Sequence, residues 1–93
     1  MAAYLVGNLK VTNAEGFTKY RELVGKTIAD HGGEYVVADV DSKSIEGDPK
    51  HLSVVLKFDT MEALQGWYDS PEYQEILALR TDNSEGIITF AQG

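Results

Sequence analysis

Apolar residues recur at two different spacings along this chain, and the order of these spacings leaves few folds open. Residues 3–11 (AYLVGNLKV) alternate between two faces, as the side chains of a β-strand do. From residue 17 onwards apolar side chains return every three or four positions, as on a helix with one buried face. The alternating spacing and β-branched composition return later and predict further strands at residues 34–40, 52–58 and 87–92.

A proline divides the helical region that precedes the last strand. In WYDSPEYQEILALR, residues 67–80, Ser70 suits a helix N-cap and Pro71 suits the first helical position, where its missing N–H costs nothing. This region therefore contains two helices, the first of which begins after a cap at Asp59 or Thr60. The residues TDNSEG that follow are predicted to form a loop.

The resulting order, β-α-β-β-α-β, is typical of an α+β, ferredoxin-like domain that occupies residues 1–93. Such a domain has a four-stranded antiparallel sheet with the helices on one face. The other face carries Tyr4, Val6 and Val55 by alternation, which are poorly suited to water. A chain this short buries only roughly 60–65% of its unfolded surface. We therefore expect a homodimer that forms through the open sheet face.

The composition excludes several classes of protein. Fifteen acidic and eight basic residues give a net charge of -7, so binding to nucleic acid is not expected. The chain has no cysteine, and no apolar run is long enough to span a membrane. Neither a signal peptide, a metal-ligand spacing nor a phosphate-binding loop is apparent. We therefore expect a cytoplasmic protein without a metal or cofactor.

The expected topology brings polar residues from separate segments to one end of the sheet. They are Asp39, Asp41, Glu46, His51 and Arg80. Arg80 has two interpretations: it neutralises Glu46 or Asp41 and complements a helix C-terminus, or it binds an anionic ligand. His51 is either an exposed or capping residue or a general base.

Three aromatic residues, Trp67, Tyr68 and Tyr73, flank the Ser-Pro step and belong either to the core or to the wall of a pocket. Trp67 and Tyr68 are adjacent and point about 100° apart, so one can be buried while the other faces a rim or cavity. The tyrosine hydroxyls need partners if buried, which suits a pocket. Asn8 lies on the open sheet face, where its amide also needs a partner.

The segments AYLVGNLKV, GG before the second strand, EG in the following loop and FDTMEALQGWYDSPEYQEILALR resemble the DUF1330 family of small bacterial proteins. The similarity covers nearly the whole chain. It implies a dimeric α/β barrel built from ferredoxin-like protomers, and it implies no particular reaction. The wider superfamily includes cofactor-independent monooxygenases, haem-degrading enzymes and lactone isomerases, which use the cavity between sheet and helices.

The haem-degrading relatives use a strand-one asparagine, a tryptophan and a histidine in the second helical region. Asn8 and Trp67 match the first two, but residues 60–80 contain no histidine, so this mode of haem ligation is not expected.

Three functions are open at this point. The chain is a cofactor-free enzyme for a small anionic, aromatic or carbonyl compound, a non-catalytic carrier or sensor, or a structural dimer without a ligand. In the enzyme, Arg80 would hold the anion, Trp67 and Tyr68 would wall the pocket, and His51 or Tyr73 would move a proton.

Overall fold

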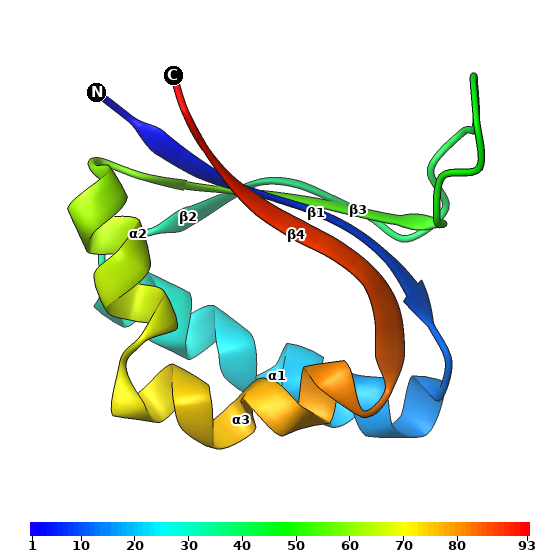
Figure 1. Cartoon of the computed structure of the whole chain (residues 1–93). Helices are drawn as coiled ribbons and strands as arrows, with labels where there is room; N and C mark the ends of the chain where they lie inside the picture. Colours follow the sequence, from blue (N-terminus) through cyan, green and yellow to red (C-terminus); the bar gives the residue numbers. More distant parts are fainter.

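The computed structural model describes residues 1–93, in which three helices cover one face of a four-stranded antiparallel sheet (Figure 1). The strands lie in the order β2-β3-β1-β4. The elements in chain order are β1 (Ala3–Val11), α1 (Ala14–Asp30), β2 (Glu34–Asp39), β3 (Leu52–Phe58), α2 (Met61–Tyr68), α3 (Pro71–Thr81) and β4 (Ser84–Gln92). This arrangement confirms the ferredoxin-like prediction.

The helices begin where local capping residues allow. The side chain of Thr60 accepts a hydrogen bond from the N–H of Ala63 over 3.0 Å, so Thr60 rather than Asp59 caps α2. Ser70 caps α3 in the same way, and Pro71 follows it at the first turn. The Ser-Pro step therefore divides this region into two helices, as predicted.

The last strand is longer than the sequence pattern indicates. β4 begins at Ser84 rather than at residue 87, because Ser84, Glu85 and Gly86 pair in register with the end of β1. The backbone N–H of Thr12 also donates to the carbonyl of Asn83 over 2.9 Å. Pairing with a neighbouring strand thus overrides the loop-like composition of these residues. β2 ends at Asp39, one residue earlier than predicted.

The core lies between the sheet and the helices. Its strand side chains are Ala3, Leu5, Leu9, Leu52, Leu56 and Phe58, and they alternate with side chains that point the other way. Apolar residues of α1, α2 and α3 complete the core, including Trp67 and Tyr73, each only 1% exposed. The predicted alternation of β1 and β3 is therefore confirmed.

The opposite sheet face is covered by no helix (Figure 1). One register row crosses all four strands on this face: Val37 pairs with Val55, Val55 with Val6, and Val6 with Thr89. Ile87 lies beside this row and is 66% exposed. We call this surface the open face. None of the helices is long and apolar enough to cross a membrane.

Candidate functional site

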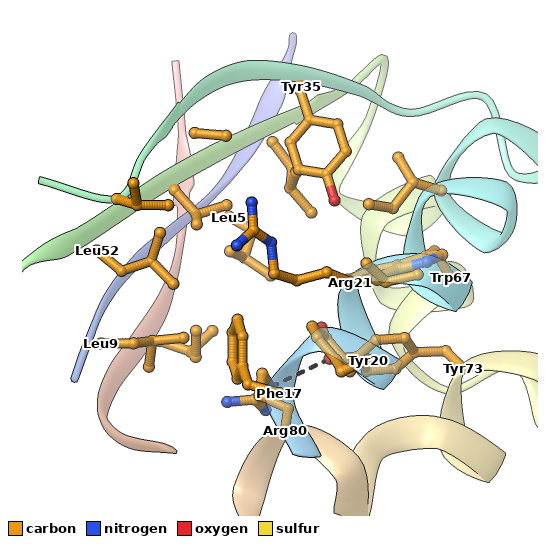
Figure 2. Close-up of a pocket in the computed structure, with 17 residues that line it drawn as sticks. Leu5, Leu9, Phe17, Tyr20, Arg21, Tyr35, Leu52, Trp67, Tyr73 and Arg80 are labelled. Atoms are coloured by element: carbon orange, nitrogen blue, oxygen red, sulfur yellow. Dashed lines mark hydrogen bonds between the residues drawn. The ribbon is translucent and has the colours of Figure 1, made fainter. Parts of the chain in front are cut away.

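A cavity of about 260 Å³ lies between α1 and the helix-facing side of the sheet (Figure 2). It is lined mainly by apolar side chains that each element presents to the layer between helices and sheet. The lining residues are Leu5, Leu9, Phe17, Tyr20, Arg21, Val24, Ile28, Tyr35, Ala38, Val40, Leu52, Val54, Leu56, Trp67, Tyr73, Arg80 and Ile88. An apolar cavity with a few converging polar groups is the usual form of a small-molecule site.

Two charged side chains line the cavity, and both are arginines. Arg21 and Arg80 are the only arginines of the chain, and both reach the cavity, whereas no acidic side chain does. Although the protein has a net charge of -7, the charged side chains of the cavity wall are both positive. The cavity therefore suits a ligand that is apolar along most of its length and carries an anionic group.

Arg80 belongs to a hydrogen-bonded cluster with two tyrosines. Its Nε–H donates to the hydroxyl of Tyr73 over 3.3 Å, and the Tyr73 hydroxyl lies 2.8 Å from that of Tyr20 (Figure 2). We call these three residues the Tyr-Arg cluster. All three side chains are buried, and Arg80 is only 9% exposed.

The surroundings of the cluster keep Arg80 charged and Tyr20 neutral. Burial of Arg80 opposes its charge, but the Tyr73 hydroxyl and then Tyr20 outweigh this effect and raise the pKa of Arg80. Burial, followed by the neighbouring Tyr73, raises the pKa of Tyr20 far above its ordinary value. The cluster is thus a set of hydrogen-bond donors around a fixed positive charge.

Arg80 forms no ion pair, contrary to the interpretation that it neutralises Glu46 or Asp41. The structure contains only the ion pairs Lys26–Asp30 and His31–Glu72, and both lie at the surface. The reason is helical geometry: Arg80 follows Tyr73 by seven residues, about two turns, so both project from the same face of α3 towards α1. The arginine is turned away from the acidic loop.

Arg21 and Tyr35 lie near each other on a different side of the cavity from Arg80 (Figure 2). Tyr35 comes from the exposed edge strand β2 and is 48% exposed. Burial raises the pKa of Tyr35, while the nearby charge of Arg21 acts in the opposite direction. Arg21 is exposed and makes no hydrogen bond or ion pair within the chain. These two residues form an adaptable, partly open part of the wall.

The aromatic residues around the Ser-Pro step divide between cavity and core. Trp67 lines the cavity, and its indole N–H donates to Oγ1 of Thr27 over 3.0 Å. Tyr68 does not line the cavity and packs instead against Trp67, Tyr73 and Phe90. The adjacent pair therefore points in two directions, as helical geometry requires, but Trp67 rather than Tyr68 reaches the cavity.

Asn8 lies on the open face and does not reach the cavity. Its amide nitrogen donates to the carbonyls of Lys50 and Leu52 over 2.9 and 3.3 Å, and its oxygen accepts from the N–H of Lys50 over 2.7 Å. These bonds hold the end of the long β2–β3 loop against β1. The partners that the Asn8 side-chain amide was expected to need are therefore backbone groups.

His51 is bonded to backbone through both ring nitrogens. Its Nε2 accepts from the N–H of Val11 over 3.0 Å, so Nδ1 carries the proton and donates to the carbonyl of Val40 over 2.9 Å. His51 lines a second cavity of about 190 Å³, which shares Phe17, Arg21, Val40 and Leu52 with the first. Its partner Val40 lies between Asp39 and Asp41, but the cavity that His51 lines does not contain Arg80.

Among the lining residues with polar groups, Tyr20, Arg21 and Tyr35 were missed by sequence reasoning, although Arg21 gave a readable signal. Arg21 follows Phe17 by four residues and precedes Val24 by three, so it interrupts the apolar face of α1. A charge at a position that the spacing assigns to the apolar face is unusual and indicates a partner or a ligand. Tyr20 carried no comparable signal, since its hydroxyl finds Tyr73 only in the folded chain.

The fold and the cavity together define a class of protein, the ferredoxin-like domain with a hollow between sheet and helices. Within this class the chain belongs to the family of the domain of unknown function DUF1330, whose model matches residues 2–93. No protein with a curated description matches the sequence.

Solved structures agree with this fold. The RPA0582 protein of Rhodopseudomonas palustris, of unknown function, superposes with a TM-score of 0.77 at 14% identity, over 99% of this chain and 82% of that chain. SnoaB of Streptomyces nogalater, a cofactor-independent oxygenase, gives a TM-score of 0.70 at 14% identity, over 99% and 92% of the two chains.

A third similar structure is that of a designed protein rather than a natural one. The de novo designed protein Foldit4 gives a TM-score of 0.65 at 14% identity, over 100% of this chain and 99% of the designed one. An architecture that natural and designed chains share carries no function by itself. Any functional conclusion must therefore come from the cavity and its side chains.

Proposed function

We propose that this protein binds a small, mainly apolar molecule with an anionic group in the cavity between α1 and the sheet. The observation that carries the proposal is the placement of both arginines in a wall that is otherwise free of charge. The exposed Arg21 costs little, whereas the buried guanidinium of Arg80 has no carboxylate and loses hydration without a matching ion pair. An anionic ligand would supply the missing partner.

The dimensions of the cavity bound the ligand. A volume of about 260 Å³ is slightly below the usual range for drug-sized molecules, which begins at about 300 Å³. It exceeds the roughly 150 Å³ that accommodates a benzene ring. A single-ring or branched aliphatic compound with one short polar group fits these limits.

Turnover of the ligand without a cofactor is the second candidate function. Tyr73 lies between Tyr20 and Arg80 and presents a hydroxyl to the cavity, where it can contact a reacting group. The cofactor-independent oxygenase SnoaB shares the fold, which supports the possibility of such chemistry on this architecture. His51 has no proton-transfer role in this proposal, because backbone groups occupy both of its ring nitrogens.

We also propose that two copies associate through the open face. The row Val37, Val55, Val6 and Thr89 spans the full width of the sheet and has no partner within the chain. A second copy would cover this row and enlarge the core of a 93-residue protein. The partner would pack behind the sheet, on the side away from the cavity.

Native mass spectrometry of freshly purified protein tests binding and association together. The expected spectrum shows a dimer that retains a small molecule, and Arg21→Gln combined with Arg80→Gln removes the molecule while the dimer persists. An empty dimer that takes up no single-ring acid at millimolar concentration would favour the structural alternative.

Light scattering tests the dimer separately. The wild type should have twice the chain mass at micromolar concentration, and Val55→Asp should give one chain mass, since a buried carboxylate without a partner is costly. The exposed control Lys19→Asp should remain dimeric. A single-chain mass for the wild type would contradict the proposed association.

A further inference from the structure

The Tyr-Arg cluster contains more hydrogen-bond donors than the protein can satisfy. A guanidinium donates from Nε and from both terminal nitrogens. Only Nε of Arg80 is bonded, to Tyr73, and the terminal nitrogens donate to no protein atom. No polar side-chain atom is left fully buried without a partner, so these nitrogens reach free space, and Arg80 lines the cavity.

The two tyrosine hydroxyls add one further donor. The Tyr73 oxygen accepts from Arg80, and one hydroxyl hydrogen is used in the contact between Tyr73 and Tyr20. If Tyr20 donates to Tyr73, the Tyr73 hydrogen is free; if Tyr73 donates, the Tyr20 hydrogen is free. In both arrangements one hydroxyl hydrogen has no acceptor among the protein groups. The terminal N–H groups of Arg80 and one hydroxyl hydrogen are therefore unused donors, beside which the tyrosine oxygens keep unused acceptor lone pairs.

The fixed positive charge and the unused N–H groups of Arg80 favour a ligand group that is anionic and accepts hydrogen bonds. An ionised carboxylate has two oxygens and no donor, and it matches the paired N–H groups of an arginine in a bidentate arrangement. A neutral amide or alcohol matches less well, because it brings no negative charge to the guanidinium. A phosphate would bring more oxygens and charge than one buried arginine and one hydroxyl can satisfy.

We propose that Tyr20, Tyr73 and Arg80 form a carboxylate subsite at one end of the cavity, and that the ligand is a small arylalkyl or branched aliphatic monocarboxylate. This inference rests on the proposed function and names its ligand class. The carboxylate contacts the terminal nitrogens of Arg80 and the free tyrosine hydroxyl. The apolar body extends along the leucine-lined sheet towards Tyr35. Tyr73 also positions Arg80 through the bond to Nε.

The test compares phenylacetate with its neutral amide, phenylacetamide, by isothermal titration calorimetry. The two probes share size and shape, so a difference in affinity reports the charged oxygens. We expect phenylacetate to bind at least about tenfold more tightly to the wild type, as hydrogen bonds to a charged group imply. Tyr73→Phe and Arg80→Gln should each weaken phenylacetate by about tenfold and change phenylacetamide by less than about twofold.

Matched variants separate this subsite from general effects. Tyr68→Phe removes a hydroxyl from the same aromatic group but outside the cavity, and Lys19→Gln removes an exposed positive charge. Neither change should alter the affinity for phenylacetate. If Arg80→Gln does not fold, Tyr73→Phe and Tyr20→Phe still decide the matter, since each removes a single oxygen from an otherwise unchanged ring.

Two results would overturn the inference, and they differ in whether the proposed function also fails. Equal affinity for both probes, unaffected by Tyr73→Phe and Arg80→Gln, would refute the carboxylate subsite and leave cavity binding intact. If neither probe binds at millimolar concentration, both the subsite and the proposed function fail.

Discussion

The Nε–H of Arg80 donates to the hydroxyl of Tyr73, which lies two turns earlier on α3. Both residues project from the same face of α3, so the arginine reaches the cavity and forms no ion pair with the acidic loop. The arginine is therefore a buried cation without a buried anion.

Replacement of Arg80 by Met should leave the unliganded protein as stable as the wild type, or more stable by up to about 2 kcal/mol. Met has a similar length and has no charge to bury, and apolar replacements of buried ionic groups are often neutral or stabilising. Chemical denaturation of ligand-free protein measures the effect, with Lys19→Met as the exposed control. A loss above about 2 kcal/mol would instead assign Arg80 a structural role.

Replacement of Trp67 by Phe should destabilise the fold by about 1–3 kcal/mol. The change removes the indole N–H that donates to Thr27 and leaves space beside Phe58, against which Trp67 packs. A double-mutant cycle with Thr27→Val isolates the hydrogen bond from the packing. Strict additivity of the two changes would show that the bond contributes nothing.

Alkaline pH should destabilise the protein through Tyr20. The native pKa of Tyr20 lies above the ordinary value of 10.0, mainly because of burial. Below pH 10.0 both the native and the unfolded state keep the Tyr20 proton, and the stabilising contribution is complete. Above it the unfolded chain loses the proton while the native state retains it, so the free energy of unfolding falls as the pH rises. Denaturation at a series of alkaline pH values should show a weaker dependence for Tyr20→Phe than for the wild type.

Replacement of Gly86 by Ala should cost roughly 1–3 kcal/mol. Gly86 has a φ of 145°, and a Cβ there would collide with the backbone carbonyl of Asn8 on the paired strand. Gly66 is the matched control, since a Cβ at this position on α2 meets no neighbour. Gly66→Ala should be neutral or stabilising, and equal thermal shifts for the two variants would contradict the explanation.

Replacement of His51 by Ala should destabilise the protein by about 1–3 kcal/mol without loss of ligand affinity. The imidazole joins the end of β1 to the segment after β2, and its removal leaves two backbone groups without these partners. Thermal denaturation and titration with phenylacetate measure the two effects. Lost affinity in a variant that remains as stable as the wild type would restore His51 as a candidate site residue.

The sequence predicted the fold well because the relevant signals are local. Alternation placed Leu5 and Leu9 on the buried face of β1, and Ser70 with Pro71 divided the last helical region in two. The start of β4 was misjudged because residues 84–86 have a loop-like composition and become strand only by pairing with β1. Of the two interpretations of Arg80, the pairing with Asp41 or Glu46 was wrong, because it was inferred from topology, whereas the direction of the side chain is set by its helical phase.

The sequence alone determined the order of elements, the two faces of the sheet and the absence of thiol chemistry, since each follows from residue type and spacing along the chain. Only the tertiary structure decided which polar groups meet. Tyr20 and Tyr73 are 53 residues apart, and their 2.8 Å contact exists because α1 and α3 pack together beneath the sheet. Long-range packing therefore created the donor cluster in which Arg80 lies, and no local pattern encodes such a contact.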